Sequence, residues 1–422
     1  MKIFALILFV AMYVLMIAKP KYRPAYALAT ACVFLVSGIL PFSRLASTIN
    51  WNVLMMIAGT MIIVHYFIVS QMPNRLAEML LKKSKNVMGV TILMSLFSGL
   101  ISAFIDNVAT VLMVAPVGLA ICRKLKINPV GMILSIAVSS NLQGAATLVG
   151  DTTSIMLGDY ANMNFMDFFW MKGRPGIFFA VELGALATIP VMMFLFRKDK
   201  EPVSSAGKTA VTSYMPTVML CLMVAALIAA SFIPGTPEMI NGFICCGLAL
   251  VTVMIDLIQK KKAEGAVAAF RELDFETLAL LTGLFIVIGG LTQIGIIDDF
   301  ATVIVRFGGN NPFLLYTIIV WGSVLISAFV DNIPYVATML PVLAAVTSAM
   351  GVEPYLLYFG LLCGATLGGN ITPIGASANI AGIGLLRKEG YQVSFREFMR
   401  IGVPYTFVAV LAGYLFIWFV WA

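Results

Sequence analysis

Two copies of one polar motif, 225 residues apart, carry the side chains of this chain best suited to chemistry. Segments 102–117 and 327–342 are identical at eight of sixteen aligned positions, and each has an aspartate and an asparagine at the centre of a hydrophobic run. Carboxylate and amide oxygens are the ligands that small hard cations prefer, and a carboxylate can take a proton instead. We therefore predict ion binding at both motifs, with the aspartates as proton carriers. The motif residues are Asp106, Asn107, Asp331 and Asn332.

A second pair of polar segments lies further along each half, and both are rich in glycine and threonine. Segment 144–150 reads GAATLVG, and segment 369–375 reads GNITPIG. Glycine and proline break helices and free backbone groups to face a ligand. Small-residue helix packing is the alternative interpretation, but the nearby Asn, Asp and Pro favour binding. The predicted binding residues here are Asn141, Gly144, Thr147, Gly150, Asp151, Thr152, Gly369, Asn370, Thr372, Gly375, Ser377 and Asn379.

Ionisable side chains inside apolar segments need an explanation. Such a group costs several kcal/mol at mid-membrane and by default indicates function. For Asp106 and Asp331 the alternative is a purely structural helix N-cap, and capping is compatible with ion binding. Glu182 lies in another apolar run and is a third proton-coupling candidate. His65, the one histidine, is expected to be structural.

The composition describes a membrane protein. Of 422 residues, 61% are hydrophobic and 11% charged, against about half and a quarter in soluble domains. The net charge of +7 does not indicate a nucleic-acid partner, because the basic residues cluster in short segments between apolar runs. Haem, nucleotide and zinc signatures are missing from the sequence, so we expect no cofactor, and no metal beyond transported Na⁺ at the motifs.

The apolar runs predict an all-α polytopic protein, since about twenty residues cross a bilayer. Runs 88–121 and 313–346 are too long for one span and carry the motifs at mid-depth, so we predict re-entrant hairpins there. The amphipathic segments 74–85 and 298–306 are predicted interfacial helices. The predicted spans are 2–18, 25–40, 53–71, 131–158, 176–196, 213–233, 238–258, 276–294, 355–385 and 402–421.

The basic residues predict the orientation. With the N-terminus outside and each hairpin returning to its own side, the cytoplasmic segments hold 22 of the 27 Lys and Arg residues, as the positive-inside rule requires. Each half then crosses five times, so repeats 1–200 and 213–422 are predicted to be inverted, each with a re-entrant hairpin and a broken helix. We predict that residues 201–212 form a cytoplasmic linker. Both termini are predicted to lie on the outer side of the plasma (inner) membrane.

The first apolar run could also be a cleaved signal peptide, with Ala25–Ala27 as its small-residue site. The basic residues Lys19, Lys21 and Arg23 follow that run directly. Such flanking charge favours a membrane span that is retained, and we predict one here.

These segments together resemble the ion transporter superfamily over essentially the whole chain. The resemblance is carried by segments 104–116, 329–341 and 368–379, and it is closer to the arsenite permease and NhaD-type sodium–proton antiporter group and the melanosomal P protein than to the divalent anion:sodium symporters. It implies hairpin tips and broken helices that enclose substrate and ions, an elevator mechanism and a homodimer. Two departures stand out: Asp-Asn replaces the Ser-Asn-Thr of the dicarboxylate branch, and Gly150 lacks a following Pro-Pro-Asn.

The aspartate pair bears on the substrate. Two unit charges about 6 Å apart interact by roughly 3 kcal/mol at an effective dielectric near 20, which penalises a dianion unless cations or protons neutralise the site. We predict a secondary active transporter and no enzyme: proton-coupled antiport of Na⁺ (or Li⁺), or efflux of arsenite. A sodium-coupled carrier of citrate- or succinate-like carboxylates is the alternative. A passive channel and an intramembrane aspartyl protease are further alternatives, and the protease is disfavoured because each aspartate sits in one copy of a repeated motif.

Overall fold

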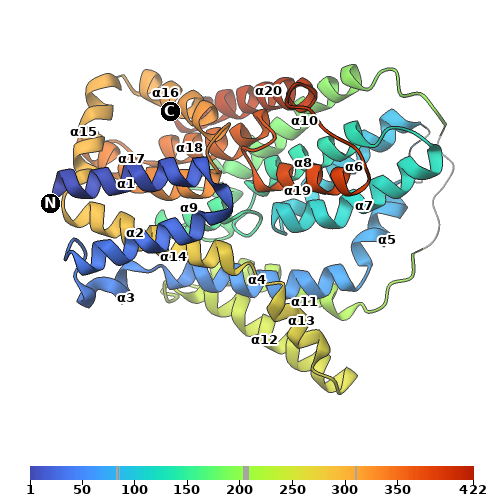
Figure 1. Cartoon of the computed structure of the whole chain (residues 1–422), viewed down its shortest axis with the longest axis horizontal. Coiled ribbons are helices and arrows are strands. Elements are labelled where there is room, and N and C mark those ends of the chain that lie inside the picture. The colour runs from blue at the N-terminus through green and yellow to red at the C-terminus, as the bar shows by residue number, and fades with distance from the viewer. Residues whose placement is uncertain (82–83, 85, 203–208, 309–310) are drawn as a thin grey trace.

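The computed structural model describes residues 1–422 except 82–83, 85, 203–208 and 309–310, and what it describes is almost entirely helical (Figure 1). Seven of the described helices are long and apolar enough to cross a membrane, and one bent pair makes an eighth candidate. The strands of the described part form a single short hairpin, β1 (Trp170–Met171) with β2 (Arg174–Pro175). The all-α polytopic prediction is confirmed.

The two halves present the same helices in the same order. The main helices of the first half are α1 (Lys2–Ala18), α2 (Arg23–Val36), α4 (Trp51–Val69), α5 (Met72–Leu81), α6 (Val87–Ser102), α7 (Asn107–Leu125), α8 (Val130–Gly144), α9 (Thr152–Tyr160) and α10 (Ile177–Leu195). Their counterparts are α11 (Met215–Ser231), α12 (Ile240–Lys260), α14 (Phe275–Gln293), α15 (Ile296–Gly308), α16 (Pro312–Ser327), α17 (Asn332–Met350), α18 (Tyr355–Gly368), α19 (Ser377–Lys388) and α20 (Phe395–Trp421).

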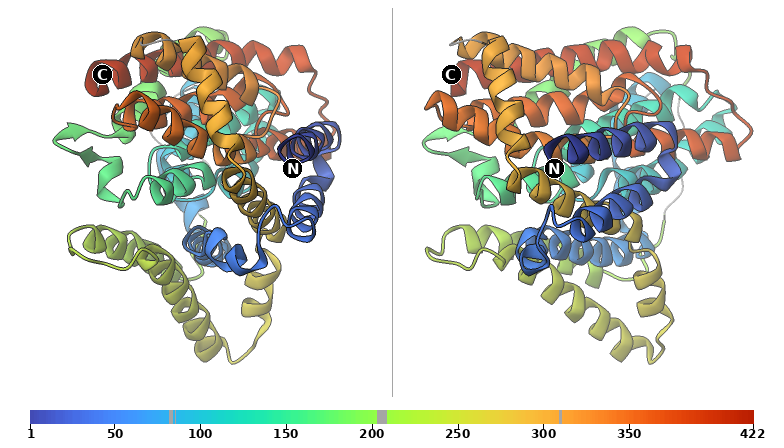
Figure 2. Two further views of the ribbon diagram at one scale, coloured as in Figure 1. Left: turned by 90° about the vertical axis from the view of Figure 1, so that its left-hand side faces the viewer. Right: turned by 60° about the vertical axis from the view of Figure 1, so that its left-hand side comes forward.

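The halves interlock rather than lie side by side. Helix α4 packs against α12, and α14 packs against α2. The second parts of the interrupted helices also change sides: α9 contacts α17 and α18, whereas α19 contacts α7 and α8. Helices α11, α12 and α13 (Glu264–Arg271) run along the lower edge in Figures 1 and 2, next to α4. The second helix of each hairpin, α7 or α17, therefore contacts a helix from the other half.

Both polar motifs form the predicted hairpin tips. Helices α6 and α7 pack together and are joined through 103–106, and α16 and α17 are joined through 328–331. The predicted spans 131–158 and 355–385 are interrupted at 145–151 and 369–376. The interfacial helices correspond to α5 and α15, and the middle of the predicted linker lies outside the described residues. Helices α3 (Leu45–Thr48) and α13 and the β-hairpin were not predicted.

Several segments predicted to share a membrane side contact one another. At one end Lys2 pairs with Asp299 at 2.8 Å, and Arg174 donates to the Val420 carbonyl at 2.9 Å. At the other end Arg123 bonds Glu389 at 3.0 Å. Figure 1 shows the N-terminus, α3 and α15 at its left side and α5 at its right. We call these the predicted outer and cytoplasmic ends.

Candidate functional site

The two motif aspartates cap the second helix of each hairpin. The Asp106 carboxylate accepts the backbone N–H groups of Val108 and Ala109, both at 3.0 Å. Asp331 accepts the N–H of Ile333 at 3.1 Å. Aspartate is a preferred N-cap because its oxygens satisfy the free N–H groups of the first turn. The capping role is therefore real, and each carboxylate keeps acceptor capacity for a further partner.

Threonines fasten each interrupted helix to its own hairpin tip. Thr147 donates its hydroxyl to the Ala103 carbonyl, and Thr372 donates to the Ala328 carbonyl in the second half. Both threonines are fully buried. The equivalent bonds are 225 residues apart, so the same frame is built twice.

Glycine is required where the frame closes. A Cβ at Gly150 would lie 2.5 Å from the Gly144 carbonyl oxygen and 2.7 Å from that of Ala103. At Gly375 the Cβ would meet the Gly369 carbonyl oxygen at 2.6 Å. These partners are backbone atoms and cannot move aside like a flexible side chain. The helix is interrupted at 145–151 although no Pro-Pro-Asn follows Gly150.

Buried amides connect the first hairpin tip to the other half. Asn107 donates to the side-chain oxygen of Asn141 at 2.9 Å. Asn141 in turn donates to the Thr366 carbonyl at 2.7 Å and to Asn370 at 3.1 Å, and Asn370 donates to the Val138 carbonyl at 2.9 Å. All of these contacts are buried. Because buried amides must be paired, this chain fixes the tip against α8 and α18.

Asp151 lies where the two half-sites meet. Its carboxylate accepts the Thr153 hydroxyl at 2.6 Å and the Asn332 amide at 3.3 Å. Asn332 belongs to the second hairpin tip, so the carboxylate of the first interrupted helix touches the other half. Asp151 also interacts electrostatically with Asp106 and Asp331. The candidate site is therefore composite.

Arginine 23 reaches the second hairpin tip but not the first. Its guanidinium Nη1 lies 2.7 Å from Asp331 Oδ2, and the two side chains are only 14% and 4% exposed. The Ser377 hydroxyl donates to the same carboxylate oxygen at 3.3 Å. Sequence reasoning assigned Arg23 to the charge flanking the first span and missed this contact. The signal was a basic residue starting an apolar run.

A cavity of about 540 Å³ lies between α4 and the hairpin tips. Glu272 and Asp274, at the junction of α13 and α14, also line it, so it reaches the predicted cytoplasmic end. No lysine or arginine is among its described lining residues. The predicted site residues that line it are Asp106, Asn107, Gly150, Asp151, Thr152, Asn332 and Ser377.

The remaining predicted residues lie outside this lining. Asp331 and eight other predicted residues are buried behind the cavity. The eight are Asn141, Gly144, Thr147, Gly369, Asn370, Thr372, Gly375 and Asn379. Glu182 lies on α10, which packs against α20, and its Oε1 is buried without a hydrogen-bond partner in the described structure. His65, expected to be structural, lines the cavity. Thr60 and Thr277 line it as well, and no feature of the sequence indicated them there.

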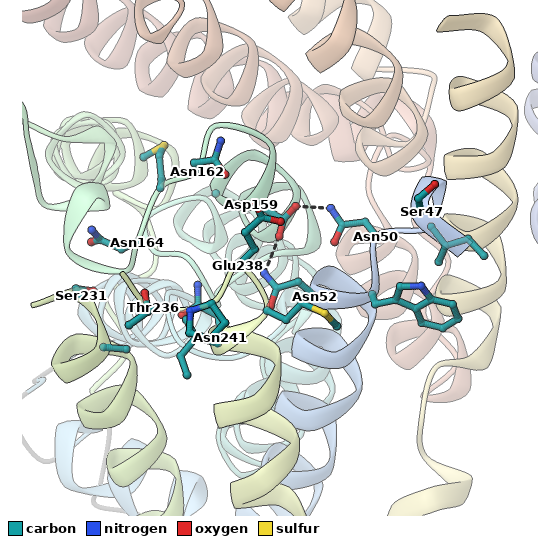
Figure 3. A pocket seen from close by; sticks show the side chains of 18 of the residues that line it. Ser47, Asn50, Asn52, Asp159, Asn162, Asn164, Ser231, Thr236, Glu238 and Asn241 are labelled. Carbon is teal, nitrogen blue, oxygen red and sulfur yellow. Dashed lines mark hydrogen bonds between the residues drawn. The ribbon is translucent and has the colours of Figure 1, made fainter. Parts of the chain in front are cut away.

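A second polar cavity of about 570 Å³ lies at the predicted outer end (Figure 3). There Asp159, in the last turn of α9, accepts the amides of Asn50 and Asn52, the latter at 2.6 Å. Figure 3 shows these three side chains pointing toward one another. Helix α9 begins at the first cavity with Thr152 and spans about 13 Å at 1.5 Å per residue. The two cavities thus flank the two ends of α9, along α4.

Two hairpin tips and two interrupted helices around a cavity that carboxylates line, in a multi-pass membrane protein, are typical of a transporter. The sequence profile of the citrate transporter family (CitMHS) matches residues 13–364 and 268–422. The chain therefore belongs to the citrate transporter family, within the ion transporter superfamily, and is a secondary transporter. The resemblance stated from the sequence is confirmed.

Named relatives agree with this assignment. An uncharacterised transporter of Mycobacterium bovis is 30% identical over 99% of this chain and 98% of its own length. The P protein of Sus scrofa is 24% identical over 97% of this chain and 58% of its own length. The crystal structure of the YdaH transporter of Alcanivorax borkumensis superposes with a TM-score of 0.62 at 12% identity, covering 89% of this chain and 87% of that one. This structural likeness concerns the fold.

Proposed function

We propose that this transporter exchanges Na⁺ (or Li⁺) for protons and binds the cation at Asp106 and Asp151. The observation that carries the proposal is the cavity, which four acidic side chains line with no lysine or arginine among its described lining residues. Asp106 uses one oxygen for two backbone N–H groups, which leaves the other for a cation or a proton. Asn107 and Thr152 add oxygen atoms to the same lining.

The cavity's charge disfavours a free polyanion. Glu272 and Asp274 add further acidic groups toward the cytoplasmic end. Each negative charge of a citrate-like anion is repelled by each fixed carboxylate with roughly 3 kcal/mol at about 6 Å and an effective dielectric near 20. A small cation is attracted by the same field. Charge therefore favours the cation as the species that these side chains bind.

A cation-coupled carboxylate carrier is the second candidate. The description of the family as citrate transporters favours it. So does the Arg23–Asp331 pair, which compensates one of the three carboxylates of the composite site. In this version the anion enters with its charge neutralised by cations, and Asp106 and Asp151 still bind the coupling ion. Arsenite is the third substrate to test, with efflux as the activity.

We further propose that the structure is an inward-open state of an elevator cycle. The first cavity, which the hairpin-tip residues and Asp151 line, reaches the predicted cytoplasmic end, whereas none of these residues is among those described as lining the outer cavity. Inverted repeats exchange such open and closed arrangements during alternating access. Assembly as a homodimer in the plasma membrane belongs to the same proposal.

Proton flux in proteoliposomes tests the proposal. Protein is reconstituted with a trapped pH-sensitive dye and challenged in turn with Na⁺, Li⁺, arsenite and citrate, with Asp106→Asn as the matched control. We expect Na⁺ or Li⁺ to drive proton movement in the wild type and not in the variant. A response to arsenite alone, or sodium-dependent citrate uptake without cation–proton exchange, would replace the lead proposal by the corresponding alternative.

A further inference from the structure

We propose that Arg23 is a built-in cation that occupies the second half-site, so that only the first half-site takes a transported cation. This inference rests on the proposed cation coupling. Arg23 would then set the number of cations that each transport cycle couples. The two hairpins would differ in cation binding although their backbones are alike. Arg23 also removes Asp331 from the proton or ion carriers while the pair is intact.

The partners of the two aspartates carry the inference. Asp331 receives three donors: the Arg23 guanidinium at 2.7 Å, the Ser377 hydroxyl at 3.3 Å and the Ile333 N–H at 3.1 Å. Asp106 receives only the backbone of its own helix turn, and in the described structure no side chain donates to it. A cation could bind beside Asp106, whereas the equivalent position beside Asp331 is occupied by the Arg23 guanidinium.

The chemistry of arginine makes this occupation permanent within one state. A guanidinium stays protonated at any physiological pH, so the positive charge beside Asp331 is permanent. Both side chains are mostly buried, and separating a buried pair leaves an uncompensated charge. A sodium ion would have to displace a tethered cation that is already desolvated. The second half-site is thus closed to small cations as long as Arg23 stays in place.

Helices α1 and α2 create this difference between the halves. Tyr13 of α1 donates to the Pro334 carbonyl at 2.6 Å, one turn beyond Asp331, and so fixes the same tip. The counterpart of α2 is α12, whose buried carboxylate Asp256 is bound to Lys260 at 2.8 Å and to Tyr66 at 3.3 Å. In the described structure α12 supplies no basic group to the first tip. The asymmetry therefore comes from the helices around the hairpins.

The test measures the Na⁺ dependence of transport in four variants. Arg23→Gln removes the tethered charge, Arg23→Lys keeps a charge, and Arg23→Gln/Asp331→Asn removes both charges. Lys21→Gln removes an exposed charge of the same segment and is the matched control. Because Hill coefficients rise toward the number of coupled sites, we expect about one for the wild type, Lys21→Gln, Arg23→Lys and the double variant, and about two for Arg23→Gln.

Each outcome decides the inference. A wild-type Hill coefficient near two, or a folded Arg23→Gln protein with an unchanged coefficient and unchanged ²²Na⁺ binding stoichiometry, overturns it. If Arg23→Gln does not fold, the double variant decides, because it leaves no buried charge unpaired. A folded double variant that has lost Na⁺-driven flux would show that Asp331 is a carrier after all. A wild type that responds to no cation instead contradicts the proposed function, which keeps the two failures distinct.

Discussion

The two hairpin tips of this transporter share one backbone frame but have different charge partners. Thr147 and Thr372 close equivalent bonds, and Gly150 and Gly375 meet equivalent carbonyls at nearly the same distances. Yet Asp106 faces an open cavity, whereas Asp331 is paired with Arg23. Because each frame is built within one half and the ion pair joins the two halves, a repeated sequence can keep the architecture twice while only one copy keeps a free acidic site.

Asp106→Asn gives the largest expected effect and tests the free tip. Losing even a supporting group costs a cation site about 10–100-fold in affinity, so losing the carboxylate should reduce Na⁺-driven proton flux by about 100-fold or more. Asparagine also caps helices well, so the variant should remain folded. Flux assays combined with size-exclusion profiles measure both properties. Normal flux in folded Asp106→Asn protein would contradict the cation assignment.

Gly150→Ala and Gly375→Ala test whether the frames are truly equivalent. Each added methyl group meets backbone oxygens well inside contact distance, and overpacking of this kind costs about 1–3 kcal/mol or more. We expect similar losses of thermal stability in the two variants, read from fluorescence-detected unfolding in detergent. Gly247→Ala, where a Cβ meets no atom within 4 Å, is the matched control. A large loss in one variant alone would show that the frames differ.

Asp331→Asn tests the paired tip by its stability. The change strands the Arg23 guanidinium in a mostly buried position, and breaking a buried pair in this way costs about 3–5 kcal/mol. Adding Arg23→Gln should recover most of that loss, since no unpaired charge then remains. Thermal unfolding of both variants measures the recovery. If Asp331→Asn were as stable as the wild type, the pair would not be a structural contact.

Glu182→Gln should have the smallest effect. Glu182 was a proton-coupling candidate from sequence, but its side chain is not among the residues that line the cavity. We expect Na⁺-driven proton flux within about twofold of the wild type, because the change keeps shape and removes only a charge outside the cavity lining. The flux assay used for Asp106→Asn measures it. A loss comparable to that of Asp106→Asn would restore Glu182 as a proton carrier.

Much of the site could be predicted because its signals are local. Aspartates that cap helices, glycine and proline that interrupt them, and apolar runs of bilayer length all act through neighbours in the chain. The hairpins and interrupted helices therefore fell where the sequence placed them. Residues that recur 225 positions apart, such as Gly150 and Gly375, also identified the frame, because a repeated motif indicates a repeated structure.

The sequence alone thus determined a membrane transporter with two hairpin tips and two helix breaks. Only the tertiary structure decided which aspartate is free. The Arg23–Asp331 pair joins residues 308 positions apart, and the Asn141–Asn370 bond joins residues 229 apart. Neither contact leaves a trace in local composition, because it depends on how the interlocked halves pack. An ion pair requires its two charged groups within about 4 Å of each other, so the choice of partner is decided by packing and not by sequence order.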